Sequence, residues 1–193
     1  EFFKINNQCF YIPSGFDTNL SGKPYKKFRI LYAGAMKPIQ NPKNLWSVLA
    51  DLIKSDENFE KLVEIVLIGN INPHVYSSEE FKKIKKRQII SHMSKNEVDK
   101  EIEISEILVV CSVNMKDCND IIPGKFFHYL SSGKKILGIS NEGSDLENII
   151  TETQSGKSFG YDNYHDLKNY IYESFKSYLA VSYTHLTLPT NRC

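Results

Sequence analysis

The sequence lacks several of the short motifs that identify common enzyme classes. No G-x-G-x-x-G follows its first apolar run, which argues against a dinucleotide-dependent dehydrogenase, and no P-loop is present. It has no Asp-x-Asp, and its histidines are scattered without metal-ligand spacing: His74, His92, His128, His165 and His185. We therefore expect no metal ion and no resident cofactor.

Cysteine pairs, excess charge and long apolar runs are also missing. The four cysteines form no C-x-x-C pair, which favours a reduced, cytoplasmic setting. A net charge of +1 creates no field that would gather nucleic acid or an acidic membrane. No apolar run approaches the length of a membrane span. We expect a cytoplasmic protein without a nucleic-acid partner.

What the sequence does contain is an alternation of apolar strands and amphipathic helices. Its 193 residues, of which 41% are hydrophobic, are enough for one domain with a substantial core. The apolar runs predict strands at 28–33, 62–68, 88–90, 107–111 and 135–139. Helical spacing and capping residues predict helices at 42–55, 78–86, 94–103, 123–132, 145–152 and 163–178. Continuous apolar strands alternating with helices are typical of a doubly wound, Rossmann-like α/β fold with a parallel sheet.

The carboxyl ends of the strands are the expected place for a ligand in such a sheet. If the strand order is 3-2-1-4-5-6, the order reverses between the first and fourth strands. The loops Gly34–Asn41 and Ser112–Ile122 then meet at one edge. Gly34 would let the chain turn closely beside a phosphate, although an ordinary strand end explains a single glycine equally well.

The segment Ile122–Ile139 is the most informative stretch of the chain. Pro123 suits the first helical position and Gly133 suits the position just past a helix end. Within this helix, Phe126, Phe127 and Leu130 are expected to form the apolar face. The segment therefore predicts a loop, a short helix and a buried strand in direct succession.

Lys125 is an unusual residue for the first turn of that helix. A cation there opposes the helix dipole, at a cost of about 0.3–1 kcal/mol, which is understandable if an anion such as a phosphate binds nearby. His128 lies three residues later and shares the face of Lys125. A lysine that points into water is the alternative that this stretch leaves open.

Four segments in order resemble the nucleotide-sugar-binding, C-terminal domain of GT-B glycosyltransferases, most closely those of family 4. Ile12–Asp17 resembles the hinge segment "IPNGFD", and Ile30–Gly34 with Asn41–Leu45 resembles the first strand, glycine loop and helix. Pro123–Gly133 resembles "PGKLFEYLASG", and Lys134–Ile139 resembles "KPILAI". The resemblance covers approximately residues 11–178.

The resemblance also implies roles for individual residues. Asp120 and His128 stand where the family has two glutamates, of which the first contacts the transferred sugar and the second accepts hydrogen bonds from the donor ribose. Asp120 is therefore the predicted catalytic residue. The predicted substrate-binding residues are Gly34, Lys37, Gln40, Lys43, Pro123, Gly124, Lys125 and His128, with Gln40 at a position where relatives often have arginine.

The expected function is donor binding for transfer of a sugar from a nucleotide diphosphate sugar to an unknown acceptor such as a glycan, polysaccharide or lipid-linked molecule. We expect 1–24 to be a hinge segment from a missing N-terminal domain, 25–179 the binding domain, and 180–193 a tail that resembles translated sequencing adapter. Without the N-terminal domain, which the family uses for the acceptor, the chain is expected to be inactive. Peripheral membrane association through that domain is left open.

Two alternatives remain at the level of sequence. A non-catalytic relative, kept for interaction or nucleotide binding, would explain the histidine at 128 and the absence of arginine between Gly34 and Asn44. A sugar-nucleotide epimerase shares the architecture but is expected to carry catalytic carboxylates and histidines in both domains.

Overall fold

The computed structural model describes residues 27–115 and 117–187, with side chains through Val181. Six strands form one parallel sheet in the order β3-β2-β1-β4-β5-β6. The strands are β1 (Phe28–Ala33), β2 (Val63–Ile68), β3 (Arg87–Ile90), β4 (Ile107–Cys111), β5 (Lys135–Ile139) and β6 (Gly156–Phe159). The predicted fold class and the predicted reversal of order between the first and fourth strands are both confirmed.

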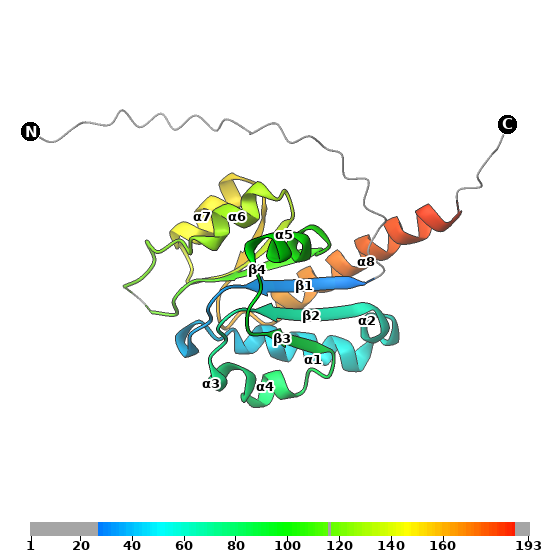
Figure 1. Cartoon of the computed structure of the whole chain (residues 1–193), viewed down its shortest axis with the longest axis horizontal. Coiled ribbons are helices and arrows are strands. Elements are labelled where there is room, and N and C mark those ends of the chain that lie inside the picture. The colour runs from blue at the N-terminus through cyan, green and yellow to red at the C-terminus, as the bar shows by residue number, and fades with distance from the viewer. Residues whose placement is uncertain (1–26, 116, 188–193) are drawn as a thin grey trace, which may run out of the picture.

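Helices cover both faces of the sheet (Figure 1). The α-helices are α1 (Lys43–Ser55), α2 (Glu57–Leu62), α3 (Pro73–Tyr76), α4 (Glu79–Lys82), α5 (Lys95–Glu103), α6 (Lys125–Ser131), α7 (Asp145–Glu152) and α8 (His165–Thr187). A single 3-10 turn, η1 (Pro38–Gln40), interrupts the loop after β1. In the part of the chain that the structure describes, no helix is both long enough and apolar enough to cross a membrane.

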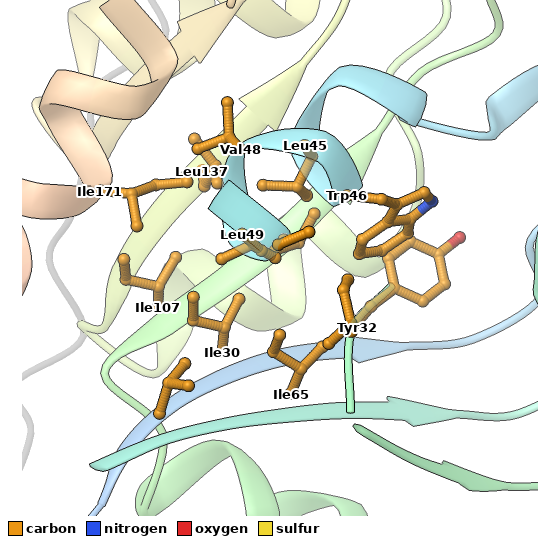
Figure 2. Packing of buried hydrophobic residues seen from close by; sticks show 14 of the residues in the cluster. Ile30, Tyr32, Leu45, Trp46, Val48, Leu49, Ile65, Ile107, Leu137 and Ile171 are labelled. Carbon is orange, nitrogen blue, oxygen red and sulfur yellow. The ribbon is translucent and has the colours of Figure 1, made fainter. Parts of the chain in front are cut away.

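Alternate residues of each strand divide the core into two clusters. On β1, Ile30 and Tyr32 face α1 and α8, whereas Leu31 and Ala33 face α5, α6 and α7. Figure 2 shows the first cluster, in which Leu49 of α1 packs over the sheet. Burying a side chain of this size contributes about 1.5–3 kcal/mol, so both faces of the sheet support the fold.

Several elements differ from the expectation. The predicted helix 78–86 is the single turn α4, after which the chain returns to β3 at Arg87. The strand β6 was not predicted, because its sequence has one buried residue, Phe159, and no apolar run. The last helix begins at His165 and continues through Thr187, beyond the expected end at Tyr178.

The apolar face of α6 also differs from the expectation. Phe126 is buried as predicted, but Phe127 is 54% exposed, and Tyr129 takes the second buried position beside the sheet. Helical geometry explains this, because residues three apart share a face while adjacent residues do not. The face that carries Tyr129 is therefore the one that meets the end of β1.

Candidate functional site

Two glycines form tight turns at the carboxyl ends of β1 and β2. Gly34 has φ +123° and Gly69 has φ +113°, which L side chains rarely adopt. The Gly34 N–H donates to the Ile68 carbonyl at 2.7 Å, and a Cβ at Gly69 would lie 2.7 Å from the Gly34 carbonyl oxygen. The two turns thus lie backbone against backbone.

Tyr129 anchors α6 to this edge of the sheet. Its hydroxyl accepts a hydrogen bond from the Ala33 N–H at 2.7 Å and lies 3.3 Å from the Ala33 carbonyl oxygen. Lys125 lies one helical turn earlier on the same face. A Cβ at Gly34 would come within 2.8 Å of the Lys125 Nζ. The anchor at Tyr129 therefore places the ammonium directly over the glycine turn.

The Lys125 ammonium lies 3.5 Å from the centre of the Tyr32 ring, a cation–π contact. The Nζ atom is shut off from solvent, and none of the residues that the structure describes accepts a hydrogen bond from it. Burial therefore lowers the pKa of Lys125 to about 8. An ammonium has three donors, so this one has capacity for the oxygens of an anion. The alternative of a lysine that points into water is therefore wrong.

A pocket of about 310 Å³ opens around this lysine. Its basic residues come from the loop after β3, from α5 and from α6, and its lining carries no carboxylate. The lining residues are Ala33, Gly34, Ile68, Gly69, Ser91, His92, Met93, Lys95, Val98, Lys125, His128 and Tyr129. Apolar walls beside lysines and histidines suit a ligand that has both a flat apolar part and negative charge.

His128 lines the same pocket and contacts α5. Its Nε2 lies 2.8 Å from the Asp99 Oδ1, and the two side chains are 41% and 42% exposed. The pair therefore links α6 to α5 across one wall of the pocket.

The structure thus brings together three of the predicted substrate-binding residues: Gly34, Lys125 and His128. Gln40 lies elsewhere and is committed to the backbone, because its Nε2 donates to the Cys111 carbonyl at 3.3 Å and its Oε1 accepts from the Lys37 N–H at 3.1 Å. These bonds join the loop after β1 to the end of β4, so Gln40 holds the loop in place.

The other predicted residues lie outside this pocket. Lys37 is exposed, and Lys43 lines a neighbouring groove with Glu80 and His74, beyond η1. Asp120 is exposed in the loop that leads to α6.

Pro123 and Gly124 form the entry to α6. The Pro123 carbonyl accepts from the Phe126 N–H at 2.9 Å, and Gly124 is the N-cap. Helix α6 thus begins at Lys125, two residues later than predicted, and these two residues set its start without lining the pocket.

Among the contributors missed from the sequence are the segment Ser91–Met93 and Asp99. The first had a usable signal, because the carboxyl end of every parallel strand lies at one edge of the sheet, and Ser91 follows β3. Asp99 had none, because only the packing of α5 beside α6 brings it to His128. In residues 27–115 and 117–187 no group of three or more His, Cys, Asp or Glu residues could hold a metal ion.

Solved structures with the same fold include several sugar-handling enzymes. The chain matches WaaG, a glycosyltransferase involved in lipopolysaccharide biosynthesis, with TM-score 0.60, 12% identity and coverage of 78% of this chain and 38% of WaaG. An α,α-trehalose-phosphate synthase (UDP-forming) from Burkholderia vietnamiensis matches with TM-score 0.59 and 7% identity, and the match covers 78% of this chain and 37% of the synthase. A putative UDP-N-acetylglucosamine 2-epimerase from Listeria monocytogenes matches with TM-score 0.50 and 13% identity, and the match covers 80% of this chain and 37% of the epimerase.

These likenesses establish the fold. The chain spans less than two fifths of each of these proteins, and over that length it has the fold of one Rossmann-like domain of a GT-B glycosyltransferase. No protein-family model and no curated protein sequence matches the chain.

Proposed function

We propose that this domain binds the nucleoside diphosphate part of a nucleotide sugar, as the donor-binding half of a glycosyltransferase. The ligand would occupy the pocket at the carboxyl ends of β1, β2 and β3, with its phosphates at Lys125. WaaG and the UDP-forming trehalose-phosphate synthase, which have this fold, support a transferase of this kind.

The observation that carries the proposal is the Lys125 ammonium. It is shut off from solvent without a hydrogen-bond acceptor among the described residues, and it points to the turn at Gly34. Burying an unpaired ammonium is costly, and the Tyr32 ring offsets only part of that cost. A diphosphate would supply the missing negative charge and acceptors.

The same ammonium could assist sugar transfer. When the bond between sugar and diphosphate breaks, negative charge grows on the departing phosphate, and a fixed cation in a site of low polarity stabilises it strongly. With a pKa of about 8, Lys125 is mostly protonated at pH 7, and a bound anion would favour the protonated form further. The lysine is therefore ready to bind the phosphates before any chemistry occurs.

The acceptor side of the reaction belongs to the part of the enzyme beyond this domain. We retain Asp120 as the residue that contacts the transferred sugar, because its loop runs directly into α6. Lys37 and Lys43 would serve phosphates only if the loop after β1 moved, because they lie outside the pocket. Transfer requires an N-terminal domain that brings the acceptor to the donor.

Calorimetric titration of the chain with uridine and guanosine diphosphates tests the binding proposal. We expect wild type to bind at least one of them, and Lys125→Met to weaken binding by about 10- to 150-fold, the effect of one charge-assisted contact. Lys100→Met is the matched control, because Lys100 is an exposed lysine of α5 outside the pocket lining. Equal affinity in wild type and Lys125→Met, or no binding to wild type at millimolar nucleotide, would contradict the proposal.

An epimerase is the second candidate, because the UDP-N-acetylglucosamine 2-epimerase of Listeria monocytogenes shares the fold. Nucleotide binding alone does not separate the two. The pocket lining has histidines and lysines but no carboxylate for acid–base chemistry at a sugar carbon, which favours the transferase. Conversion of UDP-N-acetylglucosamine to its 2-epimer without any acceptor would reverse this preference.

A further inference from the structure

Two further hollows lie at the carboxyl edge of the sheet. One, of about 390 Å³, lies between the loops after β4, β5 and β6, and the other, of about 420 Å³, lies between η1, the start of α1 and the loop after β6. They meet at Asn114, Tyr161 and Asp162, which line both, and we call the joined hollows the polar groove. Among the described residues, none that lines the polar groove also lines the pocket around Lys125. The polar groove is therefore a separate feature of the same edge.

A third hollow continues the polar groove on the far side of η1. It has a volume of about 700 Å³ and shares Pro38, Asn41 and Lys43 with the groove. Each hollow alone has the size of a small-molecule site, which is about 300–1,000 Å³. A row of connected hollows suits a chain of several linked units better than it suits one small molecule.

Hydrogen bonds hold two amide side chains of the polar groove in place and leave part of each unused. The Asn141 Nδ2 donates to the Met115 carbonyl at 2.7 Å and to the Asn119 Oδ1 at 3.0 Å. The Asn141 Oδ1 therefore remains an acceptor, and the Asn119 Nδ2 remains a donor. The groove thus presents both kinds of group in fixed positions, so that little freedom is lost when a ligand binds.

Tyr161 is fixed at the junction of the two hollows. Its hydroxyl donates to the Ser112 carbonyl at 2.7 Å, and its own carbonyl accepts from the Asn44 Nδ2 at 2.8 Å. These bonds join the loop after β6 to the end of β4 and to α1. An aromatic side chain beside amides suits a sugar, because the C–H groups of a sugar ring pack on an aromatic ring while its hydroxyls bond to the amides.

The charges that line the polar groove favour a neutral ligand. Glu80, Glu142 and Asp162 line it, and Lys43 is the one lysine or arginine in the described lining. A phosphate or a uronate would be repelled by the carboxylates. A polyamine would have no acceptor for the Asn119 Nδ2, whereas a hydroxyl group both donates and accepts.

We propose that the polar groove binds a neutral oligosaccharide, with sugar units on both sides of Tyr161. This binding activity goes beyond the proposed function and does not depend on nucleotide binding. A glycan held there would lie along the same edge of the sheet as the nucleotide pocket.

The first test follows the side-chain amide signals of Asn119 and Asn141 by nitrogen-15 NMR without nucleotide. The probes are two neutral oligosaccharides, maltoheptaose and triacetylchitotriose, with trigalacturonate as the anionic control and spermidine as the cationic one. We expect at least one neutral probe at millimolar concentration to shift these signals, and the two charged controls to leave them in place. No shift with either neutral probe, or equal shifts with a charged control, would overturn the proposal.

The second test measures the affinity of variants at the junction. The side chains of Asn114 and Asp162 form no hydrogen bond or ion pair with other residues that the structure describes, so Asn114→Ala and Asp162→Ala should keep the unfolding midpoint of wild type. We expect each variant to bind the neutral oligosaccharide about three- to tenfold more weakly, the effect of one hydrogen bond. Wild-type affinity in both variants would overturn the proposal.

Matched controls remove the same groups elsewhere on the surface. Asn148→Ala removes an exposed amide from α7, and Glu103→Ala removes an exposed carboxylate from α5. We expect both to bind the oligosaccharide as wild type does, and equal losses in the controls would contradict a site at the junction.

Uridine diphosphate separates this proposal from the proposed function. We expect it to leave the Asn119 and Asn141 signals in place and to bind Asp162→Ala as it binds wild type. Displacement of the oligosaccharide by uridine diphosphate would overturn the proposal, because the groove would then be a nucleotide site. Oligosaccharide binding by a protein that fails to bind uridine diphosphate would support the groove and contradict only the proposed function.

Discussion

Two cations are buried beside β1, and the protein surrounds them in opposite ways. Arg29, near the start of the strand, is 6% exposed and is paired with Glu64 of β2 at 2.7 Å and with Glu101 of α5. Lys125, at the carboxyl end, has an aromatic ring beneath it and no carboxylate beside it.

In our proposal, the difference separates a structural charge from one that is prepared for a ligand. A buried charge is tolerated when its partners belong to the protein, as at Arg29. A buried charge without partners weakens the folded state unless something else supplies them, as an anion would at Lys125. The two sites therefore predict opposite responses to mutation, to pH and to ligand.

Removal of Arg29 should have the largest effect. Arg29→Met leaves two carboxylates facing an apolar side chain, and we expect the free energy of unfolding to fall by about 3–5 kcal/mol. Urea denaturation followed by circular dichroism measures it. The triple variant Arg29→Met/Glu64→Gln/Glu101→Gln should recover part of the loss, because no unpaired charge remains. A loss below about 1 kcal/mol in Arg29→Met would mean that the network does not support the fold.

The second-largest effect is expected in the pH dependence of stability, which should distinguish Lys125 from Arg29. The pKa of Lys125 is about 8 in the folded protein and 10.5 ordinarily, so between these values the unfolded chain binds more protons. Stability should therefore rise as pH increases from 8 to 10.5, by at most about 3 kcal/mol. The quantity to measure is the difference in the free energy of unfolding between wild type and Lys125→Met. Other groups that titrate in this range contribute equally to both proteins and cancel in that difference.

Ligand binding should show the opposite trend over that range. The ammonium loses its proton above pH 8, so wild type should bind nucleotide more weakly as pH rises, while Lys125→Met changes less. If the differences in stability and in affinity between wild type and Lys125→Met stayed constant from pH 8 to 10.5, Lys125 would be an ordinary surface lysine.

Gly34→Ala tests the geometry that keeps the ammonium in place. The new Cβ would sit at φ +123° and 2.8 Å from the Lys125 Nζ, so we expect a loss of about 1–3 kcal/mol in the free energy of unfolding. In the background of Lys125→Met the same change should cost less, because part of the loss comes from displacing the ammonium. Equal losses in both backgrounds would show that backbone strain alone is responsible. Thermal denaturation of the four proteins gives the coupling.

The smallest effect is expected at an exposed ion pair that serves as the reference for both buried cations. Lys61 and Glu57 lie 3.3 Å apart on α2, with side chains 68% and 87% exposed. Solvent screens such pairs strongly. Lys61→Ala should therefore leave the unfolding midpoint and nucleotide affinity unchanged, and a measurable loss would indicate that surface charge matters more here than burial does.

Much of the fold follows from the sequence because its signals are local. The strands at 28–33, 107–111 and 135–139 and the helix at 145–152 were predicted with their observed bounds. The strand Gly156–Phe159 was not predicted, because in the described sheet it pairs only with β5 and has a single buried side chain. Edge strands of this kind depend on their neighbour in the sheet and carry little pattern of their own.

The candidate site was predictable only in part. Lys125 stood out because a cation opposes the start of a helix, and the alternation of strands and helices placed it at the carboxyl edge of the sheet. Whether it faced water or the interior depended on Tyr129, whose hydroxyl bonds to Ala33 and turns that face of α6 toward β1. The segment Ile12–Asp17 and the boundaries at 24 and 180 stay predictions, since the segment and most of the proposed tail lie outside the residues whose side chains are described.

The sequence by itself determined the doubly wound sheet, and it predicted Lys125 as an unusual cation at the carboxyl edge of that sheet. These depend on periodicity and on end signals that neighbouring residues carry. Only the tertiary structure decided that Gln40 is committed to the loop, that Lys125 is buried without an acceptor, and that Asp99 meets His128. Such contacts join elements far apart in the chain, and their energies depend on burial and on which helices pack together, which no local pattern records.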